Sequence, residues 1–165
     1  MKTLIAYRTQ YGSTRRCAEL IRAGIGGDVT LADLKTDPRL SVDPYDVVII
    51  GGSIYAGLIQ REVVAFCSRN REQLLARHVG LYICCLYREE RADAQLASAY
   101  PQWLLDRAFV RLPFGGRLDV DKLKPMDRFL VERVGQFSGA RDLLRYDRIE
   151  ELCRAVRALR EESTE

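Results

Sequence analysis

The sequence predicts an α/β fold: a doubly wound sheet of five parallel strands in the order 2-1-3-4-5, with an insertion after the fifth strand. Short, almost continuously apolar runs alternate with amphipathic helical stretches along the 165 residues. That alternation is typical of a parallel sheet covered by helices on both faces. The glycine-rich fingerprint of dinucleotide-binding folds is missing from the first strand–helix turn, since Gly24-Ile25-Gly26-Gly27 follows the first helix instead. Its absence favours the order 2-1-3-4-5.

The first half of the chain supplies three strands and two helices. The expected strands are residues 4–7, 29–34 and 45–50. A helix over 13–25 follows the first strand, because its apolar residues recur at helical spacing and Gly26-Gly27 ends it. Gly51-Gly52 is expected to end the third strand, and a second helix is expected from about Gln60 to Leu75.

The second half adds two strands and two helices. The strands are expected at residues 79–86 and 108–112. A third helix is expected from about Arg91 to Tyr100, with a longer alternative that continues past Pro101 to Asp106. The last helix spans about 147–161, where apolar residues again recur on one face.

The chain is expected to form a single domain over residues 1–165, because this length is typical of one domain. Residues 113–145, called the insertion below, are longer than a normal strand–helix connection. The insertion has a helical pattern of its own over about 126–137, with Phe129, Leu130, Val134 and Phe137 on one side.

Composition excludes several classes of protein. Apolar residues make up 47% and charged residues 30%, which is globular, and no apolar run reaches the length of a membrane-spanning helix. A net charge of +3 is too small to indicate nucleic-acid binding. The single histidine, His78, and five cysteines without a Cys-x-x-Cys pair favour neither a metal site nor a Ser-His-Asp triad. The short apolar run at the N-terminus is no signal-peptide core, so a cytoplasmic protein is expected.

A hydroxyl-rich turn joins the first strand to the first helix. It reads Thr9-Gln10-Tyr11-Gly12-Ser13-Thr14. Helix N-terminal amides and the helix dipole favour a dianion at such a position, and Gly12 allows close approach of the backbone. An ordinary N-cap cluster is the alternative, since Ser and Thr commonly precede helices. The place directly after the first strand favours a phosphate site at the carboxyl edge of the sheet.

Three loops together resemble the flavodoxin-like family, whose members bind FMN non-covalently. The hydroxyl-rich turn resembles the family's phosphate loop, Gly51-Gly52-Ser53-Ile54-Tyr55-Ala56-Gly57 its first flavin loop, and Cys84-Cys85-Leu86-Tyr87-Arg88 its second. The resemblance implies FMN as cofactor. The cofactor contacts that it implies are Thr9, Gln10, Tyr11, Gly12, Ser13, Thr14, Ser53, Ile54, Tyr55, Ala56, Gly57, Cys85, Leu86 and Tyr87.

A closer resemblance is to the menaquinone-dependent protoporphyrinogen dehydrogenase branch, which serves haem biosynthesis. It is carried by Met1-Lys2-Thr3-Leu4-Ile5, by Gly51-Gly52-Ser53-Ile54 with Gly57, and by Asp127-Arg128-Phe129 before Ser138-Gly139. The likeness implies an FMN-dependent oxidoreductase that passes electrons from an organic donor such as protoporphyrinogen to a quinone. Cys84-Cys85 departs from the polar or small residues expected in the second flavin loop.

In this interpretation FMN carries the redox chemistry, and no side chain is itself catalytic. Tyr55 is expected to stack on the flavin ring, whereas Tyr87 is equally well explained as a rim residue packing on the third helix. Gly52 and Gly57 would allow the peptide reorientation that flavin reduction demands in the family. Cys84 and Cys85 are expected to be buried small residues rather than a redox pair, because adjacent cysteines close only a strained ring.

Four arginines are candidates for the substrate, since a guanidinium binds a carboxylate in a bidentate manner. They are Arg88, Arg91, Arg117 and Arg128, and a solvated basic surface is their alternative role. The helix over 126–137 is expected either to touch a membrane surface, where it would meet a lipid-soluble quinone, or to pack onto its own domain.

Two other functions compete with the oxidoreductase. A flavodoxin that carries single electrons between protein partners is one, although such carriers are usually acidic around the flavin and this chain has a net charge of +3. A flavodoxin-fold binding module without a redox role is the other.

Overall fold

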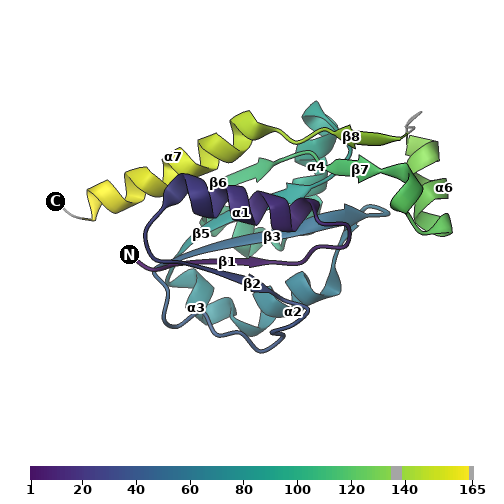
Figure 1. Cartoon of the computed structure of the whole chain (residues 1–165). Coiled ribbons are helices and arrows are strands. Elements are labelled where there is room, and N and C mark those ends of the chain that lie inside the picture. The colour runs from purple at the N-terminus through teal and green to yellow at the C-terminus, as the bar shows by residue number, and fades with distance from the viewer. Residues whose placement is uncertain (135–138, 164–165) are drawn as a thin grey trace.

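The computed structural model describes residues 1–134 and 139–163, and a parallel sheet runs through its centre (Figure 1). The sheet order is β2-β1-β3-β5-β6, so the five principal strands follow the predicted order 2-1-3-4-5. These strands are β1 (Thr3–Tyr7), β2 (Val29–Asp33), β3 (Val47–Tyr55), β5 (His78–Cys84) and β6 (Ala108–Pro113). A short strand, β4 (Leu58–Ile59), pairs antiparallel with the end of β3.

Helices cover both faces of the sheet. On one face lie α1 (Ser13–Ile25) and α7 (Tyr146–Glu162), which pack against each other (Figure 1). The helices of the other face are α2 (Arg61–Arg69), α3 (Arg71–Leu75), α4 (Glu89–Ala99) and α5 (Gln102–Arg107). The strands between them are buried on both sides, as in β1, where every residue is buried. This burial explains the near-continuous apolar runs of the sequence.

The prediction that Gly51-Gly52 ends the third strand is wrong. β3 continues through both glycines to Tyr55 and then turns into β4. Gly51 pairs with Tyr82 of β5, and a Cβ at Gly51 would overlap the Tyr82 ring. The glycine therefore makes room for an aromatic side chain inside the sheet rather than breaking the strand.

The predicted helix from Gln60 to Leu75 is interrupted at Asn70, where α2 ends and α3 begins. The Asn70 backbone leaves helical geometry there (φ −99°, ψ 21°), and its side-chain amide donates to the Phe66 carbonyl at 3.0 Å in addition to the backbone amide at 3.1 Å. Pro101 likewise separates α4 from α5, because its extended backbone (φ −67°, ψ 147°) cannot continue a helix. Residues 102–107 are helical, as the longer alternative predicted, but in a separate helix.

The insertion lies between β6 and α7, at the carboxyl end of the parallel strands (Figure 1). It contains β7 (Arg117–Asp119), a single 3₁₀ turn η1 (Val120–Lys122), α6 (Pro125–Val134) and β8 (Ala140–Asp142). β7 and β8 form an antiparallel pair that sequence reasoning missed. The helix expected over 126–137 corresponds to α6, and Phe137, at its predicted end, lies outside the described residues.

Within residues 1–134 and 139–163, no helix combines the length and the apolar character needed to cross a bilayer.

Candidate functional site

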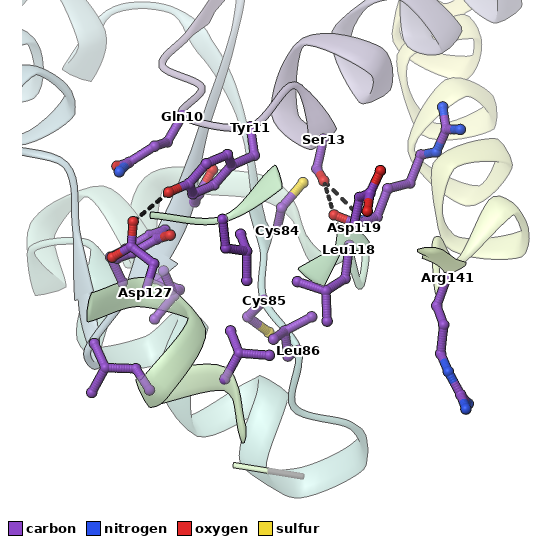
Figure 2. A pocket seen from close by; sticks show the side chains of 18 of the residues that line it. Gln10, Tyr11, Ser13, Cys84, Cys85, Leu86, Leu118, Asp119, Asp127 and Arg141 are labelled. Carbon is purple, nitrogen blue, oxygen red and sulfur yellow. Dashed lines mark hydrogen bonds between the residues drawn. The ribbon is translucent and has the colours of Figure 1, made fainter. Parts of the chain in front are cut away.

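A cavity of about 1090 Å³ opens at the carboxyl edge of the sheet. Its walls come from the turn after β1, the β3–β4 hairpin, the loop after β5 and the insertion (Figure 2). Its size is at the upper end of pockets that hold small molecules. Most of the predicted cofactor contacts line it, namely Gln10, Tyr11, Gly12, Ser13, Ser53, Ile54, Tyr55, Ala56, Gly57, Cys85, Leu86 and Tyr87.

The start of α1 forms one end of the cavity. Gly12 stands at the N-cap with φ 93°, in the left-handed region, and none of the described side chains caps the helix. The Gly12 amide donates to the Thr9 hydroxyl at 2.9 Å, which fixes the turn. The first amides of α1 therefore meet the cavity at the positive end of a helix dipole, an arrangement that suits a phosphate.

The three hydroxyls predicted for the phosphate are already engaged with protein groups. Ser13 Oγ donates to the Arg117 carbonyl at 3.0 Å and accepts from the Arg117 amide at 2.9 Å. Thr14 Oγ1 and Ser53 Oγ are 2.7 Å apart and share one hydrogen bond. Thr9 and Thr14 are not part of the cavity wall, and Thr14 is fully buried.

A hydroxyl carries one donor proton and two acceptor lone pairs, so the remaining donors can be assigned. The Ser13 hydroxyl already donates its proton to the Arg117 carbonyl. Thr9 accepts from Gly12 and keeps its proton, and the Thr14–Ser53 pair keeps one proton of two. An anion at this end is thus offered the first backbone amides of α1 and, of the Thr14–Ser53 pair, the Ser53 hydroxyl that lines the cavity. Thr9 keeps its proton but is not part of the cavity wall.

The β3–β4 hairpin forms a second wall. Its two central residues, Ala56 (φ 47°) and Gly57 (φ 80°), both have positive φ, which is the type I′ geometry of a two-residue turn. Tyr55 at its base faces Tyr11, with ring centroids 6.0 Å apart and an interplanar angle of 32°. Burial, and then Tyr11 and Asp127, raise the pKa of Tyr55 far above its usual value. Its hydroxyl therefore stays protonated and available as a donor.

The loop after β5 forms the third wall. Cys85 donates its thiol to the Tyr87 carbonyl at 3.7 Å, and burial raises the Cys85 pKa to about 11. The Arg91 guanidinium lies 5.0 Å from the centroid of the Tyr87 ring, a cation–π contact that orients the ring. Cys84 also lines the cavity, although it was not among the predicted contacts.

The insertion covers the cavity and is hydrogen-bonded at two points to the turn after β1. On one side, the Tyr11 hydroxyl donates a hydrogen bond to the Asp127 carboxylate of α6 and accepts one from the Lys124 backbone amide at 3.3 Å. On the other, Ser13 holds the backbone of β7 through Arg117 (Figure 2). Leu118, Leu123, Leu130 and Val131 supply apolar surface beneath the roof.

The four predicted substrate arginines separate into two groups. Arg91 and Arg117 line the cavity, whereas Arg88 and Arg128 do not. Arg128 forms an ion pair with Glu132 along α6 at 3.1 Å. Charged wall residues that the sequence prediction missed all belong to the insertion: Asp119, Lys122, Asp127, Arg133, Arg141 and Asp142. Their sequence signal was the density of charge in a segment predicted to lie at the carboxyl edge.

Comparison with known families assigns the chain. The flavodoxin domain family matches residues 4–143, which include every principal strand and most of the insertion. The chain belongs to the flavodoxin domain family. Flavodoxin domains bind FMN, in agreement with the cofactor expected from the loops. No curated protein sequence matches the chain significantly.

Solved structures with the same fold are distant in sequence. A two-electron reduced flavodoxin of Megasphaera elsdenii is 22% identical, with TM-score 0.52, over 69% of this chain and 83% of that one. Oxidised flavodoxin 2 of Bacillus cereus is 19% identical, with TM-score 0.55, over 94% and 97%. Rubredoxin oxygen:oxidoreductase of Desulfovibrio gigas is 15% identical, with TM-score 0.54, over 93% of this chain and 36% of that one. These likenesses establish the fold.

The residues present fit FMN. The uncapped start of α1 suits its phosphate, and two tyrosines on separate loops, Tyr55 and Tyr87, line the same cavity and are of a residue type that stacks on aromatic rings.

Proposed function

We propose that this protein is an FMN-dependent oxidoreductase that passes electrons from an organic donor to a quinone. The observation that carries the proposal is the roof: β7, α6 and β8 extend the cavity beyond the three loops and add both apolar and cationic wall residues. An electron carrier needs only an accessible flavin edge. A roofed compartment beside the cofactor suits a small-molecule reactant.

The proposed cofactor contacts follow from the donors that the protein leaves free. The first amides of α1, with the Thr9 hydroxyl and the free proton of the Thr14–Ser53 pair, would hold the phosphate. The hairpin over residues 53–57 and the rings of Tyr55 and Tyr87 would border the flavin. Bound FMN supplies two-electron transfer chemistry. Gly57 stands in the open turn of the hairpin with φ 80°, and no atom of the described residues beyond its chain neighbours lies within 4 Å of its Cβ position.

The proposed organic donor carries carboxylates, and protoporphyrinogen is the named candidate. Arg91 and Arg117, with Arg133 and Arg141 from the insertion, bring guanidinium groups to the cavity. A guanidinium binds a carboxylate through two parallel hydrogen bonds. Arg88 and Arg128 would act only at the outer rim, because they lie outside the cavity wall.

The proposed quinone acceptor and the proposed contact with a cytoplasmic membrane surface rest on α6. Met126 is 75% exposed and Phe129 is 57% exposed, while Leu130 and Val131 of the same helix face the cavity. Apolar side chains on the outer side of an interfacial helix enter the headgroup region of a bilayer. A lipid-soluble quinone would then reach the cavity under α6.

Turnover tests the proposal. The protein is reconstituted with FMN and supplied with protoporphyrinogen and menadione, and porphyrin fluorescence is followed. Quinone-dependent porphyrin formation is expected. Its absence, together with fast electron exchange with a protein partner, would overturn the oxidoreductase.

Matched variants locate the donor site and the acceptor route. Arg91→Gln is expected to raise the donor KM about tenfold or more, the value of one lost charge-assisted contact. Arg154→Gln, on an exposed position of α7, is the control and should leave KM unchanged. Met126→Ser with Phe129→Ser should slow turnover with a long-tailed quinone in anionic vesicles, while leaving menadione turnover intact.

A flavodoxin-type electron carrier is the second candidate, and one observation favours it. Leu58, at the tip of the β3–β4 hairpin beside the cavity, is 72% exposed and would suit docking of a protein partner. Leu58→Ser would slow electron exchange with such a partner in a carrier. In the proposed oxidoreductase it should leave turnover with menadione unchanged.

A further inference from the structure

Two cysteines from distant parts of the chain meet behind the cavity. Cys17 lies in the second turn of α1, and Cys84 is the last residue of β5. Their sulfur atoms are 3.7 Å apart, and both side chains are buried. Cys84 also belongs to the cavity wall, where its sulfur lies between the Tyr11 and Ser13 side chains in the view of Figure 2. One member of the pair is thus reached from the cavity, and the other stands directly behind it.

We propose that Cys17 and Cys84 form an intramolecular disulfide when a small hydroperoxide enters the cavity. The geometry favours this pair over any other. Cys85, the sequence neighbour, donates to the Tyr87 carbonyl, and a bridge between adjacent residues closes a strained ring. Cys67 lies in the core on the opposite face of the sheet, and the Cys153 thiol donates to the Ile21 carbonyl at 3.8 Å.

The reaction balances in two steps. The Cys84 sulfur attacks one oxygen of the hydroperoxide, the O–O bond breaks, and a sulfenic acid forms as water or an alcohol leaves. The Cys17 sulfur then attacks the Cys84 sulfur, the S–O bond breaks, and a second water leaves with the proton of Cys17. Two thiols lose two electrons and two protons, and the hydroperoxide gains them.

The surroundings set the rate of this chemistry. The contact with Cys17, and then burial, hold the pKa of Cys84 well above its usual value. The reacting thiolate is therefore scarce at neutral pH, so oxidation is slow and becomes faster as pH rises. Because Cys84 is only 4% exposed and Cys17 is fully buried, a small hydroperoxide reaches the Cys84 sulfur more readily than a bulky disulfide such as oxidised glutathione.

The bridge would change the start of α1. The sulfurs must close from 3.7 Å to about 2.0 Å, and Cys17 lies one helical turn after Ser13. Closure draws the first turn of α1 toward the end of β5. Resting on the proposed function, we expect FMN affinity to fall about tenfold or more, the value of one charge-assisted hydrogen bond to the phosphate.

Thiol counting tests the site on the unmodified protein. The apoprotein is treated with hydrogen peroxide, the excess is removed, and free thiols are counted under denaturant and mapped by peptide mass spectrometry. The five thiols should fall by two, with one Cys17–Cys84 peptide that has lost two hydrogen atoms. Five remaining thiols, a Cys84–Cys85 bridge, or over-oxidation of Cys84 without a bridge would overturn the proposal.

Variants sharpen the result. Cys17→Ala should trap the sulfenic acid on Cys84, detectable with dimedone, and should form no bridge. Cys67→Ala, equally buried on the other face, should form the bridge as the parent does. FMN titration of reduced and oxidised protein then measures the consequence. If the reduced protein binds no FMN, the proposed function fails, whereas the thiol count still decides the disulfide.

Discussion

The doubly wound body and the insertion are held in place by different forces. In the body, β1, β3 and β5 are buried strands between two layers of helices, and their stability comes from apolar burial. At the ends of the insertion Phe114 and Leu144 belong to the apolar core, whereas its central part leaves Met126 and Phe129 of α6 exposed and is hydrogen-bonded to Tyr11 and Ser13 of the turn after β1. Those two residues are also predicted cofactor contacts.

This difference in contacts suggests that the two regions have different roles in the proposed site. In the proposed site the loops of the body supply the phosphate and flavin contacts, and the insertion supplies the remaining wall of the cavity. Because the insertion is hydrogen-bonded to the turn after β1, a change in the structure of one should alter the structure of the other. Substitutions in the body should therefore change global stability, and substitutions at Tyr11 or Ser13 should act on the insertion and the turn after β1 with little change in global stability.

The largest expected effect is in the body. Gly51→Ala would place a methyl group in the Tyr82 ring inside the central sheet and should destabilise the fold by about 3 kcal/mol or more. Gly116→Ala in the insertion is the matched control, since its Cβ would meet no described atom closer than 3.8 Å. Chemical denaturation measures both. Equal losses would contradict the distinction between the two regions.

Alkaline pH should also act on the body, because the insertion contains no cysteine. Burial raises the pKa of Cys67 from 9.0 to about 12, and raises those of Cys85 and Cys153 to about 11. The folded state keeps these protons after the unfolded state has lost them, so stability is full below pH 9 and falls as pH rises toward 11. The free energy of unfolding should drop by about 3 kcal/mol between pH 9 and 10, roughly 1 kcal/mol for each of the three thiols. A flat profile would refute the buried neutral thiols.

Two tyrosines provide a sharper pair. Tyr100→Phe in the body removes hydrogen bonds to the Ile50 and Tyr82 carbonyls at 3.1 and 2.8 Å, and should cost about 1 to 2 kcal/mol of global stability. Tyr11→Phe removes the contacts with Asp127 and the Lys124 amide. It should speed hydrogen exchange in α6 with little change in global stability. If hydrogen exchange in α6 of the Tyr11 variant is as slow as in the unchanged protein, contacts other than those of Tyr11 hold α6 in place.

The smallest expected effect is at the hairpin. Ala56 adopts a left-handed backbone (φ 47°), which costs a non-glycine residue about 1 kcal/mol. Ala56→Gly relieves this strain but also raises the conformational entropy of the unfolded chain, which opposes folding. The net effect should be a stabilisation of the protein by a few tenths of a kcal/mol. Ala97→Gly, on the exposed side of α4, should destabilise it by about 1 kcal/mol. Thermal unfolding distinguishes the two signs.

The body was predictable because its signals are local. Apolar runs mark the strands, and the carboxyl edge of a parallel sheet brings the loops at Ser13, Ser53 and Leu86 together whatever the details of packing. Gly51 was misjudged, because a glycine that admits a ring from the next strand looks in sequence like one that ends a strand. Nothing local distinguishes the two.

The contacts that join the insertion to the body were beyond sequence reasoning. Ser13 and Arg117 are 104 residues apart, and Tyr11 and Asp127 are 116 apart. Within the body, Cys17 and Cys84 are 67 residues apart. Each pairing depends on the final position of β7, α6 or β5, which no periodicity records. The sequence could place hydroxyls near a phosphate, and only the structure shows that the Ser13 proton is already used.

Comparison of FMN with riboflavin tests the central claim most directly, since the two differ only in the phosphate assigned to the start of α1. Flavin fluorescence titration of the apoprotein should give FMN an affinity about 100-fold or more above that of riboflavin, the worth of two charge-assisted hydrogen bonds. Thr9→Val should narrow that gap. Equal affinities, or no binding of FMN at all, would contradict the account.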